Sequence, residues 1–219
     1  NYSVATDVVG RLVEVVSGMR LGDFFQKRIL GPLGMNETSF YVDPAKQSRV
    51  AALYAYDPSP ARKVRYTALE NQVLTPRSFD SGGGGLVSTA ADYWKFLQML
   101  ENGGELNGVR IVSPTTIDLM TLNHIPGNKD ISDWGRPMGE EVFYDGLGFG
   151  LGFAVVIDQA KTKVACSNGT YSWGGMASTA FWIDPVEEVT AMFFTQLMPS
   201  TTHPIRPFLR SLVYQSITE

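Results

Sequence analysis

The sequence lacks several features, and each absence excludes a class of structure or function. Its single cysteine, Cys166, rules out an internal disulfide, and a small buried hydrophobe is the expected role for that side chain. The two histidines, His124 and His203, have neither HExxH spacing nor neighbouring Cys or acidic clusters, so no metal site is expected. With a net charge of −4 and scattered Lys and Arg, the chain offers no basic face for nucleic acid.

Long apolar runs are absent as well. No run approaches the roughly 20 residues that a membrane helix needs, so no membrane segment is expected in this chain. The hydrophobic share of 44% and the charged share of 18% are typical of a globular chain. A length of 219 residues is enough for one large domain or two small ones.

Helical patterns dominate the first part of the chain. The segment 3–18 has apolar residues in an i, i+4 row, which predicts a helix packed on that side, with Ser3 as its N-cap and Gly18 as its stop. The row consists of Val4, Val8, Leu12 and Val16. Similar patterns predict helices at 21–30, 88–104 and 113–123, whereas 36–80 indicates long connections with short strands.

From about residue 147 the pattern changes to strands. Four short runs, at 148–158, 161–169, 176–184 and 188–197, are separated by turn-like residues and by one Gly/Ser loop. Connections this short can join only antiparallel neighbours. A last helix is expected at about 204–217. The predicted fold class is therefore α+β, an antiparallel sheet flanked by helices.

The expected division of the chain follows this change. Residues 1–146 form a mainly helical region with long loops, and 147–219 form the antiparallel sheet and C-terminal helix. Both are expected to be part of one domain. The polar, glycine-bearing stretch 127–146 can be a loop over a site, although an ordinary surface loop is the safer interpretation.

The usual single motifs of catalysis are missing. There is no GxSxG, so the nucleophile elbow of the α/β-hydrolases is absent. Two glycine-rich stretches fail the phosphate-binding motifs, because "GLGFGLGF" does not satisfy GxGxxG and "SGGGGL" has no following GK. A function must therefore be inferred from several stretches of the sequence taken together.

Three stretches in a fixed order resemble the penicillin-recognising serine hydrolases. They are "NYSV", "SFDSGGGGLVSTAADYWKFLQMLENGGELNG" and "GTYSWGGMASTAFWIDPVEEVTAMFFTQLMP". This family includes serine β-lactamases, DD-peptidases and β-lactamase-like carboxylesterases, and the resemblance runs from Asn1 to about Phe208. The resemblance implies a β-lactamase/transpeptidase-like fold and a hydrolytic reaction that needs no metal or cofactor.

The family's first box, Ser-x-x-Lys, does not occur in this sequence. In the family this box supplies the nucleophile and lies upstream of the Tyr box. The resemblance therefore implies a C-terminal segment, incomplete at its N-terminus, with the nucleophile on an upstream segment or a companion chain. On this interpretation the 219 residues alone are inactive, and an uncovered sheet edge favours a partner, a swapped oligomer or the missing N-terminal part.

The resemblance assigns Tyr2 the place of the family's catalytic tyrosine. A phenol with a pKa of about 10 is a poor base at neutral pH, but adjacent ammonium groups favour its phenolate form. It can then take the proton of the serine and return one to the leaving group. The alternative is a buried tyrosine that anchors the start of the helix.

The third box aligns with Trp173-Gly174-Gly175. The resemblance makes the backbone N–H of Met176 half of an oxyanion hole, and the two glycines are expected to let substrate lie along the strand edge. The alternative for Trp173 is a core aromatic before a strand. No interpretation is offered for Ser178, where relatives often carry Gly.

Two departures from the family pattern bear on the substrate. Trp173 replaces the lysine that holds a substrate carboxylate and offers a flat apolar wall, and Val4 replaces an asparagine. Both changes favour a neutral acyl ester over an anionic β-lactam, which indicates the carboxylesterase branch. A β-lactamase or DD-peptidase, and a binding or scaffold protein without a nucleophile, remain as alternatives.

Overall fold

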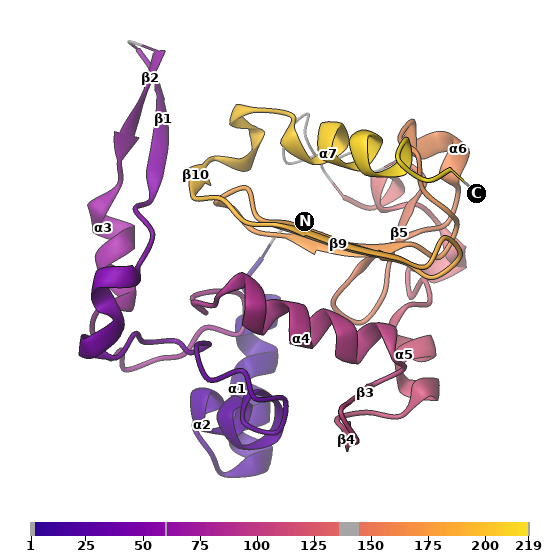
Figure 1. Cartoon of the computed structure of the whole chain (residues 1–219). Helices are drawn as coiled ribbons and strands as arrows, with labels where there is room; N and C mark the ends of the chain where they lie inside the picture. Colours follow the sequence, from indigo (N-terminus) through magenta and orange to yellow (C-terminus); the bar gives the residue numbers. More distant parts are fainter. Residues whose placement is uncertain (1–2, 60, 136–144, 219) are drawn as a thin grey trace. The chain divides into compact units, whose positions relative to one another are not determined.

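The computed structural model describes residues 3–59, 61–135 and 145–218 (Figure 1). Its contacts divide the chain into two compact units. One is built from Tyr54–Arg65 and Val112–Glu219, and the other from Tyr2–Leu53 and Tyr66–Ile111. The expectation that 1–146 and 147–219 are regions of one domain stays a prediction. None of the helices among the described residues has both the length and the apolar character needed to cross a membrane.

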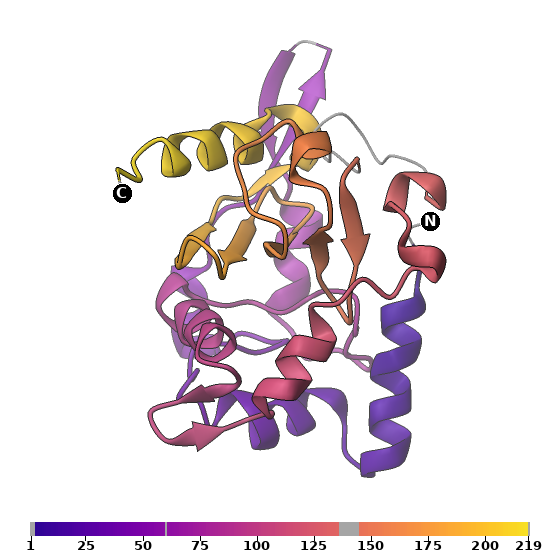
Figure 2. The ribbon, with the colours of Figure 1, turned by 90° about the vertical axis from the view of Figure 1, so that its right-hand side faces the viewer.

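The first unit contains a five-stranded antiparallel sheet in the order β5-β6-β7-β8-β9. Figures 1 and 2 both show the helix α7 lying over one face of this sheet. The combination confirms the predicted α+β class. The strands are β5 Leu147–Phe149, β6 Ala154–Val156, β7 Tyr171–Gly174, β8 Ala180–Asp184 and β9 Val189–Phe193, and α7 is Ile205–Tyr214.

Two strand predictions need correction. The run 161–169 is not a strand, because Asp158 accepts hydrogen bonds from the N–H groups of Ala160 and Lys161 and so starts the short helix α6, Gln159–Thr162. The strand β7 instead occupies the stretch that was expected to be a Gly/Ser loop. Cys166 follows α6 and is half-buried rather than buried.

The run 148–158 contains two strands instead of one. The chain turns between β5 and β6, where Gly152 has a φ of +105° and the Gly150 N–H donates to the Phe153 carbonyl. Glycine adopts this backbone conformation without the steric cost that a side chain would add. The apolar run is thus folded into a hairpin with Phe149 opposite Ala154.

A second, smaller sheet in this unit has the order β10-β1-β2. The hairpin of β1, Tyr54–Pro58, and β2, Ala61–Arg65, confirms short strands within 36–80, and β10, Leu197–Met198, pairs parallel with β1. The predicted helix at 113–123 is confirmed as α5, Pro114–Met120, with the Ser113 hydroxyl as its cap. Three single turns complete the unit: η4 Pro126–Asn128, η5 Ile131–Asp133 and η6 Ser200–Thr202.

The second unit is mainly helical. Its longest elements are α1, Ala5–Ser17, and α4, Ala90–Glu101. The position of α4 confirms the helix predicted at 88–104. The Thr89 hydroxyl caps α4 by accepting from the Asp92 N–H at 3.2 Å. The remaining elements are α2 Leu21–Phe25, the π-helix η1 Gln26–Leu30, η2 Pro44–Arg49, α3 Thr67–Glu70, η3 Asn71–Val73, β3 Glu105–Leu106 and β4 Val109–Arg110.

The first helix is where expected, but its environment is not. α1 ends at Gly18, whose φ of +66° gives a left-handed stop. Its N-cap is Val4 and not the predicted Ser3, although the Ser3 hydroxyl accepts from the Ala5 N–H. The prediction that its apolar side is packed is wrong for the described chain, because Val8, Leu12 and Val16 are 64%, 59% and 80% exposed. Gly10 is the buried residue of this helix.

Candidate active site

The third-box residues lie at the end of β7, the middle strand of the five-stranded sheet. Trp173 pairs with Phe181 of β8, and its indole packs edge-on against the Phe149 ring, with 5.4 Å between ring centroids. Trp173 is nevertheless 41% exposed. The indole is therefore held by a neighbouring ring while part of its apolar surface stays open, which differs from a fully buried core aromatic.

Beyond Trp173, the chain makes a tight turn from Gly175 to Thr179 before β8 begins. The turn is closed by the Gly175 N–H, which donates to the Thr179 carbonyl at 3.0 Å, and by the Ser178 N–H, which donates to the Gly175 carbonyl at 3.1 Å. Within the described residues the Met176 N–H donates to no other group, and the Met176 side chain is 60% exposed. The turn thus carries an available backbone donor three residues after the exposed Trp173.

The two glycines of this box are required by the packing of the chain itself. A Cβ added to Gly174 would lie 2.5 Å from Nη2 of Arg206, and one added to Gly175 would lie 2.5 Å from Oγ1 of Thr179. Both distances are shorter than real Cβ contacts. At Gly174 the backbone oxygen of Thr179 also lies 2.7 Å from the added Cβ. The expected clearance for substrate stays a prediction, whereas the neighbouring atoms of Arg206 and Thr179 already favour glycine at both positions.

Arg206, in the first turn of α7, is a residue that sequence reasoning missed. Its Nη2 donates to the Gly175 carbonyl at 2.7 Å and to the Thr179 carbonyl at 2.9 Å, so one guanidinium bridges both sides of the turn. The sequence placed the C-terminal helix but gave no signal for this contact across 31 residues. The nearest hint was the Gly-Gly pair, which often marks the close approach of another group.

Ser178 now has a structural explanation. Its φ is +70°, a left-handed conformation that favours glycine. The buried Ser178 hydroxyl donates to the Leu197 carbonyl at 2.6 Å, and the Leu197 N–H donates to the Ala177 carbonyl at 3.1 Å. These bonds attach the turn to β10 and offset the cost of a side chain in this conformation.

The opposite end of α7 is fixed by a buried carboxylate. Asp184, at the end of β8, accepts hydrogen bonds from the Tyr214 hydroxyl at 2.5 Å, from the Thr170 hydroxyl at 2.9 Å and from the Ser167 N–H at 2.9 Å. Burial alone would raise the pKa of Asp184, but these hydrogen bonds and that from the Glu187 N–H lower it overall. α7 is therefore anchored to the sheet at both of its ends.

Tyr2 lies outside the described residues, so its convergence with the Met176 N–H on one serine stays a prediction. The helix that follows Tyr2 is held by the glycine loop of the middle stretch. Asp7 accepts from the Ser81 hydroxyl at 2.5 Å and from the Gly83 N–H at 3.2 Å, and a Cβ at Gly82 would lie 2.1 Å from the Thr6 carbonyl. The glycine loop thus packs directly on the first turns of α1.

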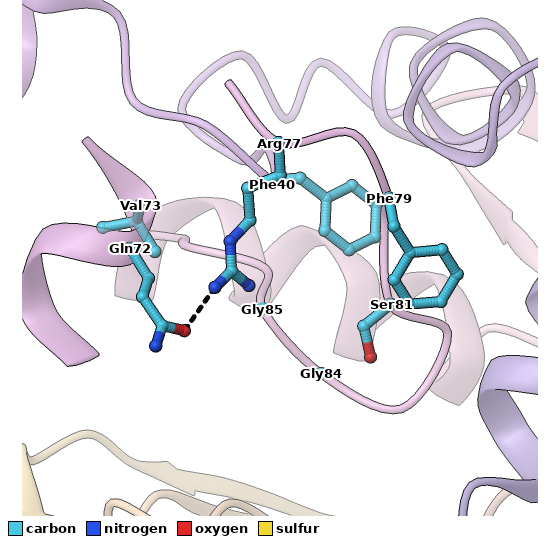
Figure 3. Close-up of a pocket in the computed structure, with 8 residues that line it drawn as sticks. All are labelled: Phe40, Gln72, Val73, Arg77, Phe79, Ser81, Gly84 and Gly85. Carbon is cyan, nitrogen blue, oxygen red and sulfur yellow. Dashed lines mark hydrogen bonds between the residues drawn. The ribbon is translucent and has the colours of Figure 1, made fainter. Parts of the chain in front are cut away.

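The same loop borders a hollow in the second unit (Figure 3). The rings of Phe40 and Phe79 and the side chains of Gln72 and Arg77 line it, and Arg77 donates to Gln72 at 2.5 Å (Figure 3). Its cavity volume of about 10 Å³ is that of a single water. An acyl group does not fit in it, so this hollow is not a candidate acyl site. Among the described residues no three His, Cys, Asp or Glu gather as metal ligands.

The five-stranded sheet, the helix α7 and the turn between β7 and β8 belong to a fold that is known from solved structures. Simvastatin synthase from Aspergillus terreus superposes with a TM-score of 0.83 at 22% identity, covering all of this chain and 56% of its own. The fold is therefore that of the β-lactamases and transpeptidases.

Sequence comparison gives the family. The model described as Beta-lactamase matches residues 1–215, and the chain belongs to this family of penicillin-recognising serine hydrolases. An uncharacterized protein of Mycobacterium tuberculosis is 36% identical over 202 residues, covering 90% of this chain and 49% of its own. Esterase EstB of Burkholderia gladioli is 27% identical over 232 residues, covering 97% and 54%. The chain thus spans about half the length of the relatives it matches.

Proposed function

We propose that this chain is part of a serine carboxylesterase that hydrolyses short acyl esters through an acyl-enzyme. The observation that carries the proposal is the turn after β7, where the Met176 N–H has no partner among the described residues and follows the half-exposed Trp173 by three residues. A backbone donor beside an apolar wall suits an ester whose carbonyl oxygen gains negative charge during the reaction. The similarity to a relative named an esterase gives further support.

The proposed chemistry needs a serine that these 219 residues do not supply in a Ser-x-x-Lys box. The serine oxygen attacks the ester carbonyl while Tyr2, paired with an upstream lysine, takes its proton. The Met176 N–H and the serine's own N–H stabilise the tetrahedral oxyanion. Tyr2 returns the proton to the leaving alcohol, and water then attacks the acyl-serine, which releases the acid and restores the serine.

Trp173 and Val4 support the preference for a neutral ester over a β-lactam. Val4 stands where the family pattern has an asparagine, so the amide group of that asparagine is missing. Trp173 offers an exposed apolar surface and no charge, so it makes no ion pair with a substrate carboxylate. A β-lactamase or DD-peptidase is the second candidate, because the family includes such enzymes. A non-catalytic binding or scaffold homologue is the third.

Substrate preference and the missing box can be tested together. The complete gene product should hydrolyse p-nitrophenyl butyrate far faster than a chromogenic cephalosporin, and its sequence should contain Ser-x-x-Lys upstream of Tyr2. The 219 residues expressed alone should be inactive. A preference for the cephalosporin would favour the β-lactamase alternative, and absence of both the box and any hydrolysis would favour the scaffold.

The proposed wall can be tested by one substitution and its control. Trp173→Ala should raise KM for the butyrate ester about tenfold, because it removes the apolar surface that contacts the acyl chain. Phe208→Ala removes another exposed aromatic side chain, on α7, and should leave KM within twofold. Equal effects of both substitutions would contradict a role of Trp173 in binding the acyl group.

A further inference from the structure

The contact between Arg206 and the Gly175 carbonyl bears on the group proposed as the oxyanion donor. The Gly175 carbonyl and the Met176 N–H belong to the same peptide unit, which is planar and trans. In such a unit the C=O and N–H point in opposite directions. A group that holds the carbonyl oxygen therefore sets the direction of the N–H, even though it never touches the N–H itself.

We propose that Arg206 is a positioning residue that orients and polarises the Gly175–Met176 peptide, so that the Met176 N–H is a fixed and strong donor to the oxyanion. This inference rests on the proposed function. The guanidinium would act through the peptide and not on the substrate. It would serve the acylation and deacylation steps alike, because both pass through an oxyanion at the same place.

The orientation follows from three hydrogen bonds around the turn. The Gly175 oxygen accepts from Nη2 of Arg206 at 2.7 Å and from the Ser178 N–H at 3.1 Å, so the peptide is held by two donors from different elements. The same Nη2 also donates to the Thr179 oxygen at 2.9 Å. Rotation of the Gly175–Met176 peptide would break the first two bonds together.

Polarisation follows from the charge of the donor. Guanidinium groups stay protonated in proteins, and hydrogen bonds from ionised donors are about twice as strong as neutral ones. A cation on the carbonyl oxygen draws electron density away from the amide nitrogen, and hydrogen bonds in a chain strengthen one another. The Met176 N–H therefore becomes a better donor than an amide at an unclamped turn.

The packing around Gly174 supports this arrangement as a built contact. The guanidinium lies where a side chain at position 174 would have to go, 2.5 Å from the ideal Cβ position. Any residue other than glycine at 174 would displace Arg206. The glycine of the third box and the arginine of α7 thus depend on each other, although the two are far apart in the sequence.

α7 offers a matched control one helical turn further on. Arg210 stacks over the Trp182 ring, with its Cζ 5.3 Å from the ring centroid, and the hydrogen bonds that hold the hairpin turn come from Arg206. Both arginines connect α7 to the sheet. Comparing Arg206→Met with Arg210→Met therefore separates the loss of a link between helix and sheet from the loss of the hold on the Gly175 carbonyl.

The kinetic experiment uses the complete gene product and p-nitrophenyl butyrate. Arg206→Met should lower kcat by about 10- to 100-fold with KM within about threefold, somewhat less than the 10²- to 10³-fold loss on removing an oxyanion donor. Arg206→Lys keeps a cationic donor and should recover part of the loss. Arg210→Met should keep kcat within threefold. An unchanged kcat in folded Arg206→Met, or an equal loss in Arg210→Met, overturns the proposal.

A second measurement does not depend on catalysis. In protein labelled with ¹⁵N-methionine, the amide resonance of Met176 is assigned by its disappearance in Met176→Leu. Arg206→Met should move this resonance strongly and Arg210→Met should leave it nearly in place. If the complete protein has no esterase activity but the resonance moves, the proposed function fails while the positioning role stands. If the resonance stays in place in Arg206→Met, the positioning role is wrong whatever the activity.

Discussion

Strand β8 and helix α1 are both rich in apolar residues, yet their environments are opposite. Every residue of β8 is buried, including Trp182 and Asp184, whereas α1 buries Gly10 and exposes most of its apolar stripe. β8 lies between β7 and β9 in the sheet, with α7 over one face (Figure 1). An apolar run in the sequence therefore predicts that a face can be buried, but not that this chain buries it.

The two elements also hold their candidate boxes in different ways. β8 and α7 fix the third box through hydrogen bonds to backbone carbonyls, as in the two bonds from Arg206. α1 is fixed near its start by the glycine loop, where backbone packs against backbone and Asp7 accepts two hydrogen bonds. Substitutions in these two regions should therefore destabilise the protein for different reasons. Four comparisons test this expectation.

The largest effect is expected in β8. Trp182→Ala removes a buried indole and its contact with Arg210, and should lower the free energy of unfolding by about 3–5 kcal/mol. Urea unfolding followed by circular dichroism measures this change. A loss below about 1 kcal/mol would contradict the close packing that the burial of β8 indicates.

The buried carboxylate should make the link between β8 and α7 depend on pH. Tyr214→Phe removes a donor to Asp184 and should cost about 1.5–3 kcal/mol at pH 7. Because the folded-state pKa of Asp184 is lowered, its contribution is present above the unfolded-state pKa of about 3.9 and is lost as the pH falls through the folded-state value.

The cost of Tyr214→Phe should therefore shrink when urea unfolding is repeated near pH 3. Tyr56→Phe, at an exposed residue of β1, is the control and should have no effect at either pH. A cost for Tyr214→Phe that is the same at both pH values would argue against a charged Asp184 as the acceptor.

In the glycine loop two neighbouring glycines should respond differently. Gly82→Ala places a Cβ 2.1 Å from the Thr6 carbonyl and should cost about 1–3 kcal/mol through overpacking. Gly84→Ala meets nothing within 4 Å and should be nearly neutral. Amide hydrogen exchange in the first turns of α1 should rise only in Gly82→Ala; equal exchange in both variants would contradict the close contact.

The smallest effect is expected on the apolar stripe of α1. Leu12→Ser replaces a side chain that is mostly exposed, so the unfolding free energy of the 219-residue chain should change by less than about 0.5 kcal/mol. The same substitution in the complete gene product is the informative partner experiment. A cost above 2 kcal/mol there would show that this stripe is covered in the whole protein.

Much of the fold could be predicted from local patterns. Periodicity located α1, α4, α5 and α7, and the predicted cap residues were correct at the starts of α4 and α5, because a helix satisfies its hydrogen bonds from its own segment. Strands were harder to place, since a strand needs a partner. The sequence predicts a loop at β7 because the strand is only four residues long and glycines lie on both sides of its Tyr-Ser-Trp run, which outweighs the strand preference of Tyr and Trp.

The candidate site shows the same division. The resemblance located Trp173, Gly174, Gly175 and Met176, and it did so from their order in the chain. Arg206 and the meaning of Ser178 could not be predicted, because both act on backbone carbonyls of distant segments. A carbonyl is present at every residue, so nothing in the amino-acid letters marks the one that an arginine will hold.

By itself, the sequence determined the α+β class, the longer helices and the family, because periodicity and motif order are properties of neighbouring residues. Tertiary structure alone decided which apolar faces are buried, that the two glycines make room for Arg206 and Thr179, and which peptide of the turn is clamped. Those features depend on distances between segments that are remote along the chain, and such distances exist only once the sheet and its covering helix have come together.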